Sequence, residues 1–294
     1  SVDKKYFSIT NLKNTNMGYT YSLSALFEKS FYFGLDLAAS YTFGHSKSVY
    51  DGTSSVAYSN WKYNYAVDSN NPGLAYSMFD IPHRVMVSVG YRTPRYAKGF
   101  MATTVSLVYN GYVGQRYSLT MNESYYDAEK KKTVYIDYNG DGWGGNSLLY
   151  IPTEDELQKM DFKTEEDRRK FDEWIEGDSY AKKHRGAYAM RNSNSAPWEN
   201  RVDLHVAQDI FVLKDRGSKF QVTFDVTNFA NMLNKKWGTT YTAAYNVMPL
   251  QVIGSKKGED GNYTNTYAYN SRNTITKNDV LSRWHAQIGF KYIF

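Results

Sequence analysis

The final segment of the chain alternates between apolar and polar side chains, and this alternation restricts the fold more than any other feature. Successive side chains of a strand point to opposite faces, so a period of two predicts a strand with one apolar and one polar face. The apolar positions are Trp284, Ala286, Ile288, Phe290, Tyr292 and Phe294, and the residues between them include His285, Gln287, Gly289 and Lys291.

Six earlier segments show the same two-faced pattern. Together they predict about seven antiparallel strands of roughly 10 residues, the length that a tilted strand needs to cross a bilayer. Short turns follow the first, third and fifth strands, near 28–34, 93–99 and 214–218, whereas long polar segments follow the second, fourth and sixth. Outer-membrane β-barrels have short periplasmic turns and long extracellular loops, so we expect a periplasmic C-terminus. The six segments are 19–27, 35–43, 85–91, 101–109, 198–212 and 220–226.

Composition favours such a barrel over a soluble β-sandwich or jelly roll, which would also contain alternating strands. Aromatic residues make up 17% of the chain, yet mean hydropathy is only −0.62. A barrel with a polar interior, polar loops and a lipid-facing surface accounts for both values, and Tyr and Trp near strand ends suit the lipid interface. No run approaches the roughly 18 to 20 apolar residues of a transmembrane helix. A net charge of +5 does not indicate a nucleic-acid partner.

The strand count predicts that residues 1–294 are the C-terminal part of a single barrel. An odd number of strands cannot close a bacterial barrel with both ends in the periplasm, so we expect the remaining strands in another part of the protein. The chain begins at Ser1 without a starting Met or an apolar signal segment, which fits the expectation that a part upstream is missing.

The longest loop, residues 121–197, is predicted to fold as an extracellular element containing short helices. Thr153 and Thr164 each precede a run of acidic residues, the pattern of a helix N-cap. Phe171, Trp174 and Ile175 would form one apolar face of the second helix.

The same loop contains a candidate calcium site. Asp137, Asn139 and Asp141 occupy relative positions 1, 3 and 5 of a calcium loop, with Gly142 at position 6. The twelfth position is Leu148 rather than the usual Glu, and Glu154, Asp155 and Glu156 are candidates to complete the shell. The alternative is a metal-free turn, which Asn-Gly-Asp-Gly also favours. No cofactor other than this calcium is expected.

Charged side chains on the polar faces of the strands are predicted to face the barrel lumen. The main interpretation is a salt-bridge network that braces the wall, because charges in a confined lumen must be paired or hydrated. Direct contact with a substrate is the alternative. Aromatic loop residues such as Trp61, Tyr63 and Tyr65 would either pack within loops or stack on sugars or peptides. The predicted lumen-facing residues are Arg84, Arg92, Arg201, Asp203, His205, Asp209, Asp225, His285 and Lys291.

An enzyme is not indicated. The five His residues show no metal-ligand spacing, and no Ser or Cys is arranged with them as a nucleophile. Acidic residues 154–156 are consecutive and point in different helical directions, so they are better explained as favourable charges at a helix start than as a catalytic pair.

Several motifs, in order along the chain, resemble TonB-dependent outer-membrane receptors of Bacteroidetes, in particular the Oar-like subgroup. Besides the final segment, they are Phe79-Asp80-Ile81-Pro82-His83-Arg84-Val85, Asn139-Gly140-Asp141-Gly142, Leu148-Leu149-Tyr150-Ile151-Pro152, Lys183-His184-Arg185-Gly186, Ala196-Pro197-Trp198-Glu199-Asn200-Arg201-Val202-Asp203-Leu204 and Asp225-Val226-Thr227-Asn228-Phe229-Ala230-Asn231-Met232-Leu233-Asn234-Lys235-Lys236-Trp237-Gly238.

The resemblance implies a barrel of about 22 strands filled by an N-terminal plug, with a TonB box through which the inner membrane supplies energy for moving a large solute. It also implies that Phe290, Tyr292 and Phe294 form a C-terminal signal for barrel assembly. The expected partners are the rest of the receptor, TonB, outer-membrane lipid and a surface protein. The alternative function is a structural, surface protein-binding or export-related outer-membrane barrel.

Overall fold

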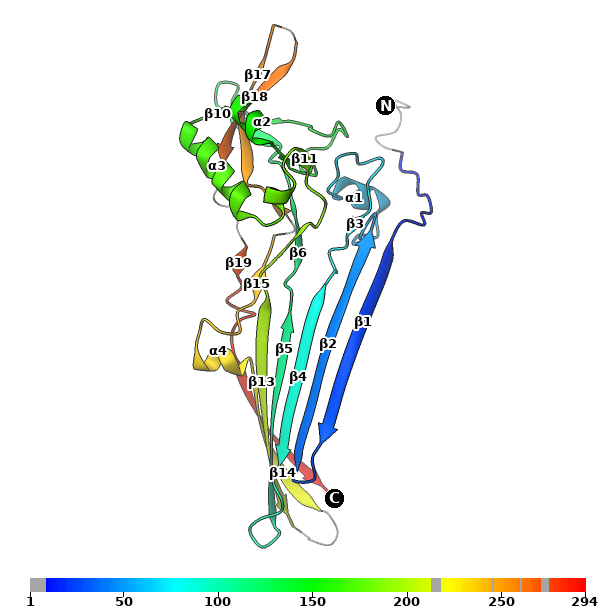
Figure 1. Cartoon of the computed structure of the whole chain (residues 1–294), viewed down its shortest axis with the longest axis vertical. Helices are drawn as coiled ribbons and strands as arrows, with labels where there is room; N and C mark the ends of the chain where they lie inside the picture. The colour runs from blue at the N-terminus through cyan, green and yellow to red at the C-terminus, as the bar shows by residue number, and fades with distance from the viewer. Residues whose placement is uncertain (1–8, 213–217, 245, 260, 271–274) are drawn as a thin grey trace.

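A computed structural model describes residues 9–212, 218–244, 246–259, 261–270 and 275–294. Its principal sheet contains seven long antiparallel strands in the order β1-β2-β4-β5-β13-β14-β20, with the short β3 (Ala75–Tyr76) paired to the end of β2 (Figure 1). The long strands are β1 (Tyr19–Ser30), β2 (Leu35–Ser48), β4 (His83–Arg92), β5 (Met101–Tyr112), β13 (Glu199–Phe211), β14 (Lys219–Thr227) and β20 (His285–Ile293).

The pairings between these long strands run without a register shift, so the sheet has two chemically different faces. Residues directly opposite each other in an antiparallel pair share a face. One face carries Leu23, Val87, Leu107, Phe224 and Ile288 and is mainly apolar. The other face is mainly polar, with Ser and Thr on β1 and β2 and charged residues on the later strands. This confirms the two-faced strands predicted from the sequence.

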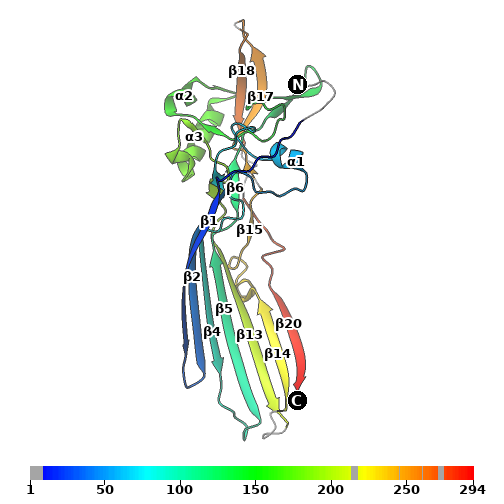
Figure 2. The same ribbon diagram turned by 90° about the vertical axis from the view of Figure 1, so that its right-hand side faces the viewer.

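The two margins of the sheet are open. β1 and β20 each pair on one side only among the described residues, and they lie at opposite edges of the sheet in Figure 2. The sheet is therefore not closed into a barrel. Unpaired N–H and C=O groups along a long edge strand must find partners. The prediction of a closed barrel of about 22 strands thus goes beyond what this sheet contains.

Short and long connections lie at opposite ends of the sheet. The turns after β1 and β4 share one end with the C-terminus, and β13 ends and β14 begins there, whereas the long connections gather at the other end (Figure 1). Gly34, with a φ of +95°, closes the first turn in a backbone conformation that other residues rarely adopt. The predicted turn at 214–218 lies largely outside the described residues. For the connections that the structure describes, the predicted alternation of short and long lengths is confirmed.

At the long-connection end, the described residues of three segments form a second body, which we call the cap: 49–82, 113–198 and 237–284. Its sheets are small, with the orders β10-β18-β17, β11-β9, β12-β6-β16, β15-β19 and β7-β8. Its strands are β6 (Arg116–Leu119), β7 (Ser124–Asp127), β8 (Lys132–Tyr135), β9 (Tyr150–Ile151), β10 (Asp161–Phe162), β11 (Ala187–Tyr188), β12 (Asn194–Ser195), β15 (Tyr241–Thr242), β16 (Asn246–Val247), β17 (Leu250–Lys257), β18 (Tyr263–Tyr269) and β19 (Thr276–Lys277).

The buried apolar core lies in the cap rather than on the long sheet. Leu119, Leu149 and Ile151 are fully buried there, together with helix residues Phe171 and Ile175. By contrast, Ile288 on the long sheet is 62% exposed. The cap can therefore bury its own apolar surface, whereas the apolar face of the sheet needs an apolar environment to cover it.

Two helices of the cap, α2 (Glu154–Lys159) and α3 (Glu165–Gly177), begin where the sequence predicts. Thr153 and Glu156 form a reciprocal capping box at the start of α2, and the Thr164 side chain accepts a hydrogen bond from the Asp167 amide at the start of α3. Phe171 and Ile175 are buried, and the Trp174 ring stacks on Phe171, so the three residues of the predicted apolar face pack inward. The other helices are α1 (Ala57–Lys62), the 3-10 helix η1 (Ala181–Lys183) and α4 (Phe229–Leu233), which lies beside β13 (Figure 1).

In the part of the chain that the structure describes, no helix is both long and apolar enough to cross a membrane.

Candidate functional site

The charged residues predicted to face a lumen all lie on the polar face of the long sheet. Asp209 is the best-buried of their carboxylates, with a side chain only 2% exposed. It accepts hydrogen bonds from Arg92 Nη2 at 2.7 Å, Lys219 Nζ at 2.7 Å and Gln221 Nε2 at 2.8 Å. One carboxylate thus joins β4, β13 and β14 through their side chains.

The remaining charges on this face form smaller groups. His205 Nδ1 lies 2.5 Å from Asp225 Oδ1 across the β13-β14 pairing, and Arg201 pairs with Asp203 at 2.9 Å along β13. Arg84 donates to Asn110 on the neighbouring strand at 3.1 Å. These contacts have the form that the bracing interpretation predicts. Near the edge of the sheet, His285 and Lys291 stand opposite Thr227 and Gln221.

Phe290 and Tyr292, assigned above to a C-terminal assembly signal, lie on the apolar face of β20. The Tyr292 ring contacts Phe220 on β14 with centroids 4.8 Å apart. Phe290 and Phe294 are 82% and 96% exposed. Their apolar surfaces are therefore available to another chain or to lipid.

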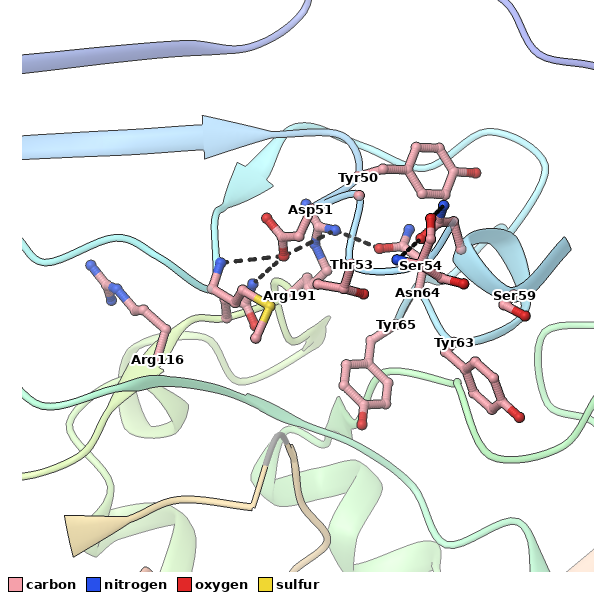
Figure 3. A pocket seen from close by; sticks show the side chains of 14 residues that line it. Tyr50, Asp51, Thr53, Ser54, Ser59, Tyr63, Asn64, Tyr65, Arg116 and Arg191 are labelled. Carbon is pink, nitrogen blue, oxygen red and sulfur yellow. Dashed lines mark hydrogen bonds and ion pairs between the residues drawn. The ribbon is translucent and has the colours of Figure 1, made fainter. Parts of the chain in front are cut away.

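The cap contains a pocket of about 470 Å³ beside α1, within the size range of small-molecule sites. Figure 3 shows its side chains, which converge from the segment after β2, from α1 and the residues after it, and from the segment before β12. Polar and aromatic residues dominate the lining, which includes Tyr50, Asp51, Thr53, Ser54, Ser59, Tyr63, Asn64, Tyr65, Arg116 and Arg191.

Arg191 provides a buried positive charge at one wall of the pocket. Its guanidinium donates to Asn64 Oδ1 and to the Ser48 carbonyl at 2.6 Å, and it lies 3.7 Å from Asp51 Oδ2. Burial lowers the pKa of Arg191 below its ordinary value, and the negative charge of Asp51 opposes that shift. Burial likewise raises the pKa of the Tyr50 phenol. Fixed donors beside aromatic rings suit a polar solute with oxygen acceptors.

Sequence reasoning missed most of this pocket. It named Tyr63 and Tyr65 as aromatic loop residues, and both line the pocket, whereas Trp61 does not. Asp51 and Arg191 are 140 positions apart in the sequence, and nothing in either local pattern indicates their proximity. Asp80 was also missed as a site residue. It lies in the resemblance motif before β4, is buried, and pairs with the pocket residue Arg116.

The candidate calcium loop has part of the expected geometry. The Asp137 carboxylate accepts hydrogen bonds from the amides of Asp141 and Gly142, at 3.2 Å and 2.7 Å. Asp141 Oδ2 accepts from Ser69 Oγ at 2.6 Å and from Asn146 Nδ2 at 2.7 Å. Asn139 Nδ2 donates to the same Asn146, at 2.9 Å. The Asn139 and Asp141 side chains therefore connect the loop to Ser69 and Asn146.

Of the three acidic residues considered as a completion of that shell, Glu156 bonds to other groups. Its carboxylate accepts hydrogen bonds from the Thr153 amide, within the capping box, and from the Tyr150 hydroxyl. Among the described residues, no group of three His, Cys, Asp or Glu side chains converges as a metal cluster. Calcium binding at Asp137, Asn139 and Asp141 stays a prediction.

Glu123, which the sequence analysis did not single out, lies close to this loop. Its side chain is buried, with the residue 4% exposed. Neither carboxylate oxygen makes a hydrogen bond of ordinary geometry. Burial raises the pKa of Glu123 to about 7, and the nearby hydroxyl and amide of Ser147 and the amide of Asn146 limit the rise.

Comparison with known proteins agrees with the fold. A family model described as an outer membrane beta barrel domain matches residues 3–282. No curated protein and no solved structure matches the chain. The matched region includes the first six long strands and nearly all of the cap. The chain therefore belongs to the outer membrane β-barrel domain family, and its long two-faced sheet is part of an outer-membrane protein.

Proposed function

We propose that the chain is the C-terminal barrel portion of a TonB-dependent transporter that moves a large solute across the outer membrane. In this proposal the rest of the receptor provides the strands that pair with β1 and β20, and a plug that fills the lumen. TonB supplies the energy through that plug. The resemblance of the ordered motifs to Oar-like receptors leads to this proposal, and the fold supports it.

The strongest support comes from the long sheet, which has one apolar and one polar face and is open at both edges. An apolar face suits lipid, and a polar face with paired charges suits a water-containing lumen. Seven strands with unpaired margins require further strands, because edge N–H and C=O groups cannot remain unsatisfied within a bilayer. A large composite barrel meets both requirements.

The proposed orientation follows from the same sheet. Short turns and the C-terminus would lie in the periplasm, and the cap would lie outside the cell. The pocket beside α1 would then meet a solute before the solute reaches the lumen. Its polar and aromatic lining indicates a ligand rich in oxygen acceptors, such as a glycan or a peptide.

The decisive experiment measures binding of TonB to the intact outer-membrane protein that contains this chain. The protein is purified in detergent and titrated against the purified periplasmic C-terminal domain of TonB, with an unrelated porin in the same detergent as the control. We expect saturable binding to this protein and none to the porin. Equal signals for the two proteins would overturn TonB dependence.

A surface protein-binding barrel is the second candidate. Tyr126, Tyr135 and Tyr188 of the cap are 65%, 74% and 51% exposed, and exposed Tyr is common in protein interfaces. A surface protein that co-purifies stoichiometrically, together with no TonB binding, would favour this candidate over transport.

A further inference from the structure

The Glu123 carboxylate is the most anomalous buried group among the described residues. Both oxygens are buried, and neither makes a hydrogen bond of ordinary geometry. A buried carboxylate without well-formed hydrogen bonds is costly, so it is protonated or matched by a positive charge. A buried polar group of this kind often marks an ion or water that completes its coordination.

Other oxygen groups surround this carboxylate. The Ser147 hydroxyl is also buried and makes no hydrogen bond of ordinary geometry, and it lies close enough to the Glu123 carboxyl to lower the pKa of that group. The Glu123 carbonyl accepts a hydrogen bond from the Ile136 amide at 2.7 Å, which places Glu123 beside the residue that precedes Asp137. Besides burial, the negative charge of Asp137 raises the pKa of the Glu123 carboxyl, as expected for two neighbouring carboxylates.

Gly144 leaves space at the same point. A Cβ atom on Gly144 would lie 3.6 Å from Glu123 Oε2 and 3.7 Å from the Ile136 carbonyl oxygen. The absence of a side chain therefore keeps a position open that faces both a carboxylate oxygen and a carbonyl oxygen.

We propose that Glu123 and Asp137 together bind one divalent cation, calcium. Ser147 Oγ and the Ile136 carbonyl would act as neutral ligands, and water would complete the shell. All of these donors are oxygens, which calcium prefers over the softer nitrogen and sulfur ligands of zinc. Two carboxylates would balance the charge of one such ion.

This site differs from the one that the loop motif alone predicted. Asp141 and Asn139 bond to Ser69 and Asn146, so they would support the loop from outside rather than bind the ion. Glu123 would replace the carboxylate that is missing at Leu148. It comes from the strand side of the loop, 14 positions before Asp137.

The cation would also stiffen one wall of the pocket. Asp141 holds Ser69 at 2.6 Å, and the Ser69 carbonyl accepts the Tyr50 hydroxyl at 3.2 Å. Trp143 of the same loop lies under the Lys62 ammonium of α1, which is 3.2 Å from the ring centroid. Ordering residues 136–147 would therefore order Tyr50 and α1. This inference does not depend on transport or on TonB.

Calcium binding is tested on the intact detergent-purified protein after chelation, by isothermal titration with CaCl₂ and by thermal unfolding with and without calcium. We expect binding and a calcium-dependent rise in the melting temperature. Glu123→Gln keeps the shape of the side chain and should weaken calcium binding by about tenfold or more. Glu129→Gln, at an exposed position of the β7-β8 turn, is the matched control and should bind as the parent does.

Ser147→Ala gives a second, milder variant in case Glu123→Gln fails to fold, and it should weaken binding while the protein keeps its heat-modifiable migration on gels. The proposal is overturned if the parent protein binds no calcium up to about 1 mM, a weak affinity for an extracellular site. Unchanged affinity in both Glu123→Gln and Ser147→Ala, with loss only in Asp141→Asn, would overturn it as well.

Discussion

The carboxylate of Asp80 accepts hydrogen bonds from Arg116 Nη2 at 2.6 Å and from Arg116 Nε at 3.0 Å. Asp80 lies in the connection between β3 and β4, and Arg116 begins β6 of the cap. Both side chains are buried, and Asp80 also accepts the Ser46 amide of β2 at 2.6 Å. Through the Ser46 hydrogen bond and this ion pair, Asp80 connects the end of β2 to β6 of the cap and to the pocket.

Arg116→Leu should therefore loosen the junction between the sheet and the cap. Removing one partner of a buried ion pair leaves the other charge uncompensated, at a cost of roughly 3 to 5 kcal/mol. Hydrogen exchange followed by mass spectrometry should show faster exchange at the β2 end around Ser46. The control is Arg169→Leu on α3, whose solvent-exposed pair with Glu166 should contribute little to stability. If amides around Ser46 exchange at the same rate in Arg116→Leu and Arg169→Leu, Arg116 does not hold the sheet and the cap together.

Asp209→Ala should destabilise the long sheet without affecting the cap. It leaves Arg92 and Lys219 without their shared partner on adjacent strands. The cost should stay below about 3 to 5 kcal/mol, because the Arg92 side chain is half exposed and can be hydrated. The temperature at which the folded band is lost on semi-native gels should fall. Asp203→Ala, which removes a more exposed partner, should change that temperature less.

Tyr63→Ala should slow uptake of the transported solute while leaving the stability of the protein nearly unchanged. The Tyr63 side chain lines the pocket and is 63% exposed, so its removal opens little buried space. Mass spectrometry of spent medium would identify solutes that cells deplete only when they carry the intact protein. Depletion of that solute should slow in Tyr63→Ala cells. Tyr135→Ala, at an exposed position outside the pocket, should deplete it at the parent rate.

In calcium-free solution, the cap should lose stability as pH rises from about 4.5 to about 7. The pKa of Glu123 is near 4.5 when unfolded and about 7 in the folded cap, so the folded state binds its proton more strongly over that interval. Stability then declines with pH and levels off above about 7. Thermal unfolding of the chelated protein across this range should show the decline. Glu123→Gln cannot titrate and should remove that slope, whereas Glu129→Gln should retain it.

The sequence predicted the long sheet well because its signals are local. Alternation in segments such as 284–294 depends only on the period of a strand, and the same is true of the turn lengths. The helix starts at Thr153 and Thr164 also depend on neighbours within three positions. These elements therefore follow from short stretches of sequence and do not depend on contacts between distant residues.

The candidate sites depend on the tertiary structure because their partners come from distant segments. The pairs Asp80 with Arg116 and Asp51 with Arg191, and the approach of Glu123 to the Asp137 loop, arise only when the connections fold together into the cap. By itself, the sequence determined which side chains share a face of a strand, since backbone geometry imposes that. The tertiary structure decided which charges are buried and paired, because burial and Coulomb attraction depend on distances in space rather than on separation along the chain.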